Sequence, residues 1–250
     1  MKTSNKLLIV LFFFVVITLV LFNVLLNVQL KAGNLSSEYQ KTTRSTVTMK
    51  PFQHVVYDGR QYLHQSRSSQ SWVSRTIHLS VGDRNKHELE IPSNFEPILR
   101  YHYQGDTLFI GFSSEDGAFG RADYIPDGSI PLRLFAPALS SVASVGGIMN
   151  VDRIRQQEPL ALHLANSANF MLLGLDIPVL QLHADSNAQV MVVDNSHVDT
   201  LALTMGKSTG ITFVTPNNIK NILPVQLDST ARIRVDGKAA DMKTYLQKTQ

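Results

Sequence analysis

The motif LALHL at residues 160–164 returns as LQLHA at 180–184, LALTM at 201–205 and LPVQL at 223–227. Each copy is followed by a second alternating motif, which is ANFML at 168–172, AQVMV at 188–192, TGITF at 209–213 and ARIRV at 231–235. Matching positions are offset by 20, 21 and 22 residues, so the insertions fall between the motifs. A fixed period of this length is typical of proteins built from stacked repeats.

The alternation within each motif predicts β-strands, because successive side chains of a strand point to opposite faces. Leu160, Leu162 and Leu164 therefore share one face, and Ala161 and His163 share the other. Small polar residues suited to sharp bends separate the two motifs of each repeat, namely Asn166-Ser167, Ser186-Asn187, Lys207-Ser208 and Ser229-Thr230. We predict an all-β fold, a parallel β-solenoid (β-helix) with about 20–22 residues per coil. A β-sandwich is the alternative, since its strands also recur at short spacing.

The composition excludes several classes of protein. With 44% hydrophobic and 17% charged residues, the 250-residue chain has the composition of a folded protein and not of a disordered one. The formal net charge is only +3, and no basic run occurs among aromatic residues, which argues against a nucleic-acid partner. The chain has no cysteine, which excludes disulfides, thiol nucleophiles and thiolate metal sites.

Residues 7–30, after a six-residue N-terminal tail (residues 1–6), are almost wholly apolar. A helix of about twenty residues spans a hydrocarbon core of about 30 Å, so we predict a transmembrane signal anchor at residues 7–30. A cleaved signal peptide is the alternative, although the segment is long for one and lacks an Ala-x-Ala site. We therefore expect a single-pass protein of the bacterial cell membrane, with its β domain facing the periplasm or exterior.

The rest of the chain divides by composition into a polar linker (residues 31–45), a β-rich domain (46–237) and a polar C-terminal tail (238–250). The domain comprises an N-terminal part (46–131) and the regular coils (132–237). Within the N-terminal part, Gln104-Gly105-Asp106 predicts a hairpin turn between two strands. The serine-rich residues 61–74 predict an exposed loop.

The order of these elements resembles a known family. Paired strands around YQGDTLFI (residues 103–110) precede LRLFAPALSSVASVGG (132–147), and stacked repeats continue to Val235. Over residues 46–237 this pattern is similar to the family named "putative auto-transporter adhesin, head GIN domain", which comprises bacterial envelope proteins. The resemblance implies a β-solenoid without known catalytic residues. Repeat corners in that family are commonly glycine-rich, whereas only Gly146-Gly147 has that character here.

Two histidines occupy equivalent positions on neighbouring repeats. His163 and His183 both point outward, and we expect them to stack about 4.8 Å apart. Such a pair is a weak candidate for binding a metal or for responding to pH. The equivalent positions in the next two repeats are Thr204 and Gln226, which add no further imidazole or carboxylate ligand. Ordinary solvated surface is the alternative interpretation.

No catalytic or cofactor-binding residue emerges from the sequence. Ser167 lacks the Gly-x-Ser-x-Gly nucleophile elbow. No two acidic residues of the repeats are one full repeat apart; these residues are Asp176, Asp185, Asp194 and Asp199. His197 lies near Asp194 and Asp199 in sequence, but this does not imply that their side chains meet in space. We therefore expect no enzymatic activity and no cofactor.

The function we predict is a membrane-anchored, extracytoplasmic module for binding, adhesion or envelope scaffolding. Its expected partners are the membrane, through residues 7–30, and an envelope polysaccharide or protein. One alternative is a structural β-helix that self-assembles through exposed terminal coils, as bactofilins do. Arg232, Arg234 and Pro224 in the last repeat argue against that assembly. The other alternative is a carbohydrate-active β-helix enzyme.

Overall fold

The computed structural model describes Thr18 and residues 21–24, 43–65, 69–113, 131–193, 196–214 and 218–236. The chain divides into two compact units, Met1–Thr43 and Arg44–Gln250. The predicted C-terminal tail (238–250) lies outside the described residues, and so does most of the predicted linker (31–45).

The membrane-spanning helix expected at residues 7–30 falls mostly outside the described residues. Thr18 and residues 21–24 are described, as helix with exposed side chains. Among the residues that the structure describes, no helix has the length and apolarity needed to cross a membrane. This finding contradicts the predicted transmembrane signal anchor and the single-pass localisation at a bacterial cell membrane. Both predictions rested on apolar composition, which does not by itself set the length of a helix.

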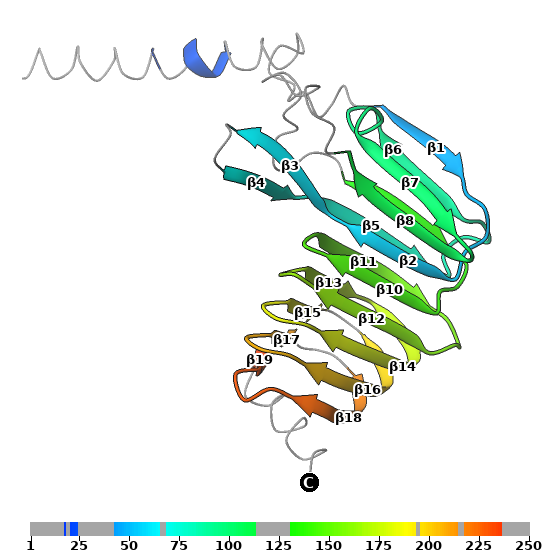
Figure 1. Cartoon of the computed structure of the whole chain (residues 1–250), viewed down its shortest axis with the longest axis vertical. Helices are drawn as coiled ribbons and strands as arrows, with labels where there is room; N and C mark the ends of the chain where they lie inside the picture. Colours follow the sequence, from blue (N-terminus) through cyan, green and yellow to red (C-terminus); the bar gives the residue numbers. More distant parts are fainter. Residues whose placement is uncertain are drawn as a thin grey trace, which may run out of the picture. The chain divides into compact units, whose positions relative to one another are not determined.

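The described residues of the second unit form strands joined by turns (Figure 1). In chain order they are β1 (Arg44–Thr48), β2 (His54–Asp58), β3 (Arg60–Gln65), β4 (Ser69–Ser74), β5 (Thr76–Val81), β6 (Glu88–Pro92), β7 (Leu99–Gln104), β8 (Thr107–Phe112), β9 (Leu132–Ala136), β10 (Ser141–Val145), β11 (Ile148–Arg155), β12 (Leu160–Ala165), β13 (Asn169–Leu173), β14 (Leu175–Ala184), β15 (Gln189–Val193), β16 (His197–Met205), β17 (Gly210–Val214), β18 (Asn218–Leu227) and β19 (Arg232–Asp236). All but β3 and β4 belong to one 17-stranded sheet, and those two form a separate antiparallel hairpin.

The large sheet is mixed and curls around one apolar core (Figure 1). One ladder joins β7, β8, β2, β10, β12, β14, β16 and β18 in that order. The other joins β1, β6, β9, β5, β11, β13, β15, β17 and β19. The pairs β1–β6, β6–β9 and β7–β8 are antiparallel, and the remaining pairs of the two ladders are parallel. Pairing of β11 with β14 connects the ladders.

This mixed sheet contradicts the predicted parallel β-solenoid. The repeated motifs do pair in parallel at the predicted offsets, as Leu180 does with Leu160 and Leu201. Antiparallel strands in the first part of the domain, however, make the fold a curled mixed sheet. Alternation marks a strand but is the same for parallel and antiparallel pairing. The repeat of residues 160–235 therefore could not be extended to residues 46–131.

Two local predictions in the first part of the domain have opposite outcomes. The hairpin turn at Gln104-Gly105-Asp106 is confirmed, because β7 and β8 are antiparallel and Gly105 has a φ of +63°. The exposed loop expected at residues 61–74 is wrong, because β3 and β4 occupy most of this segment. Serine-rich composition misled the prediction, since a strand that does not belong to the main sheet needs no strong apolar alternation.

Inward side chains of successive strands stack into apolar columns. Leu162, Leu182 and Leu203 are neighbours in one such column and are almost fully buried. Burying each leucine contributes roughly 1.5–3 kcal/mol. The bends between the repeat strands include four left-handed residues, namely Asn166, Ser167, Asn187 and Ser208. Short polar side chains tolerate this conformation because they bond to the nearby backbone.

The two parts of the domain meet around a buried tyrosine. The Tyr57 hydroxyl donates a hydrogen bond to the Arg75 carbonyl at 2.8 Å, and burial raises the pKa of this phenol well above its ordinary value. Gly59 and Gly147 pack against each other beside its ring. A Cβ on Gly147 would lie 2.7 Å from Tyr57 Cε1, so this contact requires glycine.

Candidate functional site

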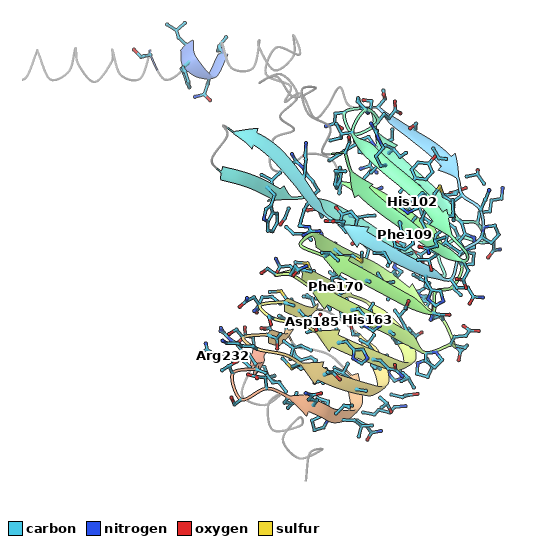
Figure 2. All side chains as sticks on the ribbon, in the orientation of Figure 1. His102, Phe109, His163, Phe170, Asp185 and Arg232 are labelled. Carbon is cyan, nitrogen blue, oxygen red and sulfur yellow. The ribbon has the colours of Figure 1, made fainter. Side chains whose placement is uncertain are left out.

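The predicted histidine pair is stacked on the outward face of β12 and β14. The ring centroids of His163, which is labelled in Figure 2, and His183 are 4.8 Å apart, and the ring planes differ by 7°. Partial burial lowers the pKa of His163, and the nearby His183 lowers it further, while Asp185 opposes these effects. The neutral imidazole is therefore favoured at this position.

Metal binding by the histidine pair stays a prediction. Thr204 and Gln226 continue the His163–His183 row on β16 and β18. Throughout the described part of the chain, no three His, Cys, Asp or Glu residues are grouped so as to hold a metal ion.

The acidic residues of the repeats do not converge on one site. Asp194 lies outside the described residues. Asp199 contacts Lys220 at 2.5 Å and His197 Nε2 at 3.5 Å, although closeness in sequence alone did not predict the contact with His197. The hydrogen bond from Lys220 lowers the pKa of the Asp199 carboxyl, which keeps it ionised. This exposed group forms a surface ion pair across neighbouring strands.

A serine, a histidine and an aspartate that the sequence did not single out lie together at the ends of β2, β8 and β10. Ser141 Oγ is 2.7 Å from His54 Nδ1, and His54 Nε2 is 3.6 Å from Asp106 Oδ2. The second distance is too long for a hydrogen bond. The backbone N–H groups of Ser140 and Ser141 both donate to the Gln53 carbonyl, so neither can stabilise an oxyanion. No local motif could have revealed the group, because its members come from three distant segments.

Two exposed methionines lie side by side on the opposite ladder. Met171 of β13 pairs with Met191 of β15, and their side chains are 37% and 40% exposed. They line a hollow of about 200 Å³ together with polar residues of the same strands and of β17. We call this surface the methionine face, defined by the outward side chains of Asn169, Met171, Gln189, Met191 and Thr212.

A second, polar hollow adjoins the methionine face. Its volume is about 810 Å³, and it extends over Gly210 to the last strand, where Arg232 and Arg234 line it. Figure 2 labels Arg232 on this strand. Gln189 and Thr212 line both hollows. The repeat alignment contained these residues, but it could not show that their outward side chains adjoin two hollows.

The last two strands also expose apolar side chains at the end of the sheet. Leu223, Val225 and Leu227 of β18 and Ile233 of β19 are exposed, Val225 to 68%. Within the described residues, no further strand pairs with β18 or β19 on their outer edges. Edges of this kind can pair with another chain.

No protein-family model matches the chain, and no curated protein matches its sequence. Three similar solved structures are a putative adhesin of Bacteroides fragilis (10% identity, TM-score 0.38), a putative lipid binding protein of Parabacteroides distasonis (11%, 0.41) and a putative adhesin of Parabacteroides merdae (11%, 0.37). The alignments cover 79%, 78% and 78% of this chain and 98%, 97% and 96% of those chains, respectively. Similarity this distant carries no argument about function. Proteins named putative adhesins occur among the similar structures, but the predicted membership of the head GIN domain family is not confirmed.

Proposed function

We propose that the β domain is a non-catalytic binding module whose ligand lies on the methionine face. The observation that carries this proposal is the exposure of Met171 and Met191 side by side at the floor of a hollow. Methionine side chains are flexible and polarisable, and they recur at binding surfaces. Asn169, Gln189 and Thr212 around them supply hydrogen-bonding groups, as is usual in binding sites.

The geometry around Ser141 supports a non-catalytic role. Its hydroxyl contacts His54, but the imidazole is not hydrogen-bonded to Asp106 and the nearby amides are engaged. An activated serine needs a base oriented by a third group and donors for the developing oxyanion. This arrangement supplies neither of them.

The partner that we propose is a polymer of the cell envelope or the surface of another protein. Side chains of the methionine face repeat from strand to strand at about 4.8 Å. A polymer with repeated units can make the same contact at several such positions. Adhesion would follow if that polymer belonged to another cell.

Binding of the full-length chain to purified envelope polysaccharides and peptidoglycan tests the proposal. We expect the double variant Met171→Gln, Met191→Gln to bind at least about tenfold more weakly, because it removes exposed apolar contacts. Tyr101→Gln is the control, since Tyr101 is an equally exposed apolar residue on β7. Equal binding by the wild type and the double variant would contradict a role of the methionine face.

A second candidate function is self-association, which the exposed apolar residues of β18 and β19 favour. Pro224, Arg232 and Arg234 oppose it, because proline and charge on an edge strand hinder further pairing. Sedimentation velocity of the full-length chain distinguishes the outcomes. Self-association predicts a concentration-dependent oligomer that Val225→Asp abolishes, and an oligomer unchanged in Val225→Asp would refute this interface.

A further inference from the structure

The two hollows form one continuous surface that changes from apolar to cationic. Along one row of paired residues, Met171, Met191, Thr212 and Arg234 follow one another on β13, β15, β17 and β19. The row crosses about 14 Å at the usual spacing of strands. Gln189 and Thr212 line both hollows and thus join the apolar part to the cationic part.

Outward apolar side chains that line neither hollow continue the strands beyond the two methionines. Leu173 and Val193 form the next outward pair on β13 and β15, and both are half-buried. Val214 lies at the corresponding end of β17 and is also half-buried. A flexible methionine pair beside branched aliphatic residues suits an alkyl chain, whose shape varies from one conformer to the next.

The cationic part contains two arginines on one face of β19. Arg232 and Arg234 are two residues apart, so both point outward. Arg234 Nε donates to Asp236 Oδ1 at 2.6 Å, whereas the guanidinium of Arg232 has no carboxylate partner among the described residues. Gly210 lies next to Arg232 in the ladder, and a side chain there would collide with Gln189. The glycine therefore keeps the space beside Arg232 open.

Hydroxyl groups surround this cationic space. Ser208, Ser229 and Thr230 line the hollow. Thr230 is already engaged, because its hydroxyl donates to Asp228 Oδ1 at 2.6 Å and accepts from the Ser208 amide at 2.8 Å. Guanidinium groups bind phosphate oxygens through paired, charge-assisted hydrogen bonds. Arginine next to neighbouring hydroxyls therefore matches a phosphate group better than a neutral one.

We propose that the methionine face also binds an amphiphile with an alkyl chain and an anionic phosphate group. Its alkyl chain lies on Met171 and Met191, and its phosphate lies beside Arg232 and Arg234. Charge complementarity fixes the direction of the ligand along the row. This inference rests on the proposed binding function, and it adds a second class of ligand to the envelope partner.

The direct test compares three probes, namely dodecyl phosphate, dodecyl maltoside and inorganic phosphate. NMR titration of the full-length chain with labelled methionine methyl groups reports binding at Met171 and Met191 and leaves other binding sites out of the measurement. We expect dodecyl phosphate to bind at least about tenfold more tightly than either other probe, because only it fits both parts of the surface. Equal affinity for dodecyl phosphate and dodecyl maltoside would overturn the proposed phosphate contact.

Variants separate the two halves of the contact. Arg232→Gln should weaken dodecyl phosphate binding at least about tenfold and leave dodecyl maltoside binding unchanged. Met191→Gln should weaken the binding of both dodecyl phosphate and dodecyl maltoside, measured by the NMR signal of the Met171 methyl group. Arg153→Gln is the control, because this exposed arginine of β11 lies outside both hollows. An effect of Arg232→Gln on both probes alike would refute the proposal.

The two proposals can fail separately. One outcome is that envelope polymers bind through Met171 and Met191, whereas dodecyl phosphate shifts neither methionine methyl signal. This outcome would refute the amphiphile proposal and leave the proposed binding function intact. If neither polymer binding nor dodecyl phosphate binding depended on the methionine face, both proposals would be refuted.

Discussion

The first part of the β domain (residues 44–136) and the second part (141–236) are held together by different interactions. In the first part, ion pairs and rings fix individual side chains: Glu90 bonds both Arg44 and Arg84, and the Arg84 guanidinium lies 3.5 Å from the centre of the Phe135 ring. In the second part, main-chain ladders and stacked apolar columns recur from strand to strand. Specific contacts therefore define the first part, and periodic contacts define the second.

This difference has a consequence for where a ligand can bind. Side chains of the first part, such as Arg44 and Glu90, hold the antiparallel strands β1 and β6 together. Outward side chains of the repeats contribute little to the fold, so their chemistry can change without unfolding the domain. The methionine face and the two arginines of β19 belong to this second group. The comparison can be tested by substitutions in each part.

The largest effect is expected in the apolar columns. Leu203→Ala should lower the free energy of unfolding by about 2–5 kcal/mol, because Leu203 is fully buried and its loss leaves a cavity. Leu227→Ala should cost less than about 1 kcal/mol, because this leucine at the end of β18 is 44% exposed. Urea denaturation measures both. Equal losses of unfolding free energy in the two variants would mean that β18 is buried as fully as β16.

The next effect is expected where the two parts meet. Gly147→Ala should destabilise the domain by about 1–3 kcal/mol, because the added Cβ would crowd Tyr57 and Gly59. Gly111→Ala is the matched control, since a Cβ there meets only ordinary contacts at 3.7 Å. If thermal unfolding gave the same midpoint for both variants, the close packing at the junction would be refuted.

The ion pairs of the first part predict a smaller, salt-dependent effect. Glu90→Gln should lower stability by about 1–2 kcal/mol, because the side chain is only 14% exposed and its loss leaves Arg44 and Arg84 without this partner. Added salt should narrow the difference from wild type. Asp199→Asn, which affects an exposed ion pair of the second part, should change stability much less. A larger loss of stability in Asp199→Asn than in Glu90→Gln would contradict the view that side-chain ion pairs matter more in the first part.

The smallest effect concerns pH. The pKa of His163 is lowered in the folded domain, mainly by partial burial and then by His183, so the unfolded chain binds more protons below its histidine pKa of about 6.5. This contribution to stability is present above that pH and is lost as the pH falls towards the folded pKa. His163→Gln should flatten the stability profile in this range. An unchanged profile in His163→Gln would contradict the assigned cause.

The sequence predicts the second part of the fold better than the first. The period of Leu160, Leu180 and Leu201 identifies which strands become neighbours, because residues one repeat apart pair directly. In residues 46–131 no period exists, and alternation alone does not set the direction of pairing. The β6–β9 and β1–β6 pairs join segments that are distant in sequence and had no signal in the pattern.

The candidate site was predicted only in part. The stacking of His163 on His183 follows from equivalent repeat positions and is confirmed. Met171 and Met191 occupy equivalent positions as well, but the polar hollow beside them depends on the turns and on the absence of a side chain at Gly210. The contact between Ser141 and His54 arises from the pairing of β2 with β10, which lie far apart in the chain.

Hydrogen–deuterium exchange of the full-length chain, with and without dodecyl phosphate, tests most directly whether the ligand lies on the second part of the domain. We predict slower exchange in β13, β15, β17 and β19, and unchanged exchange in β2, β7 and β8. Arg232→Gln should remove the protection. Protection confined to β2, β7 and β8, or protection of β13 to β19 that persists in Arg232→Gln, would contradict the account.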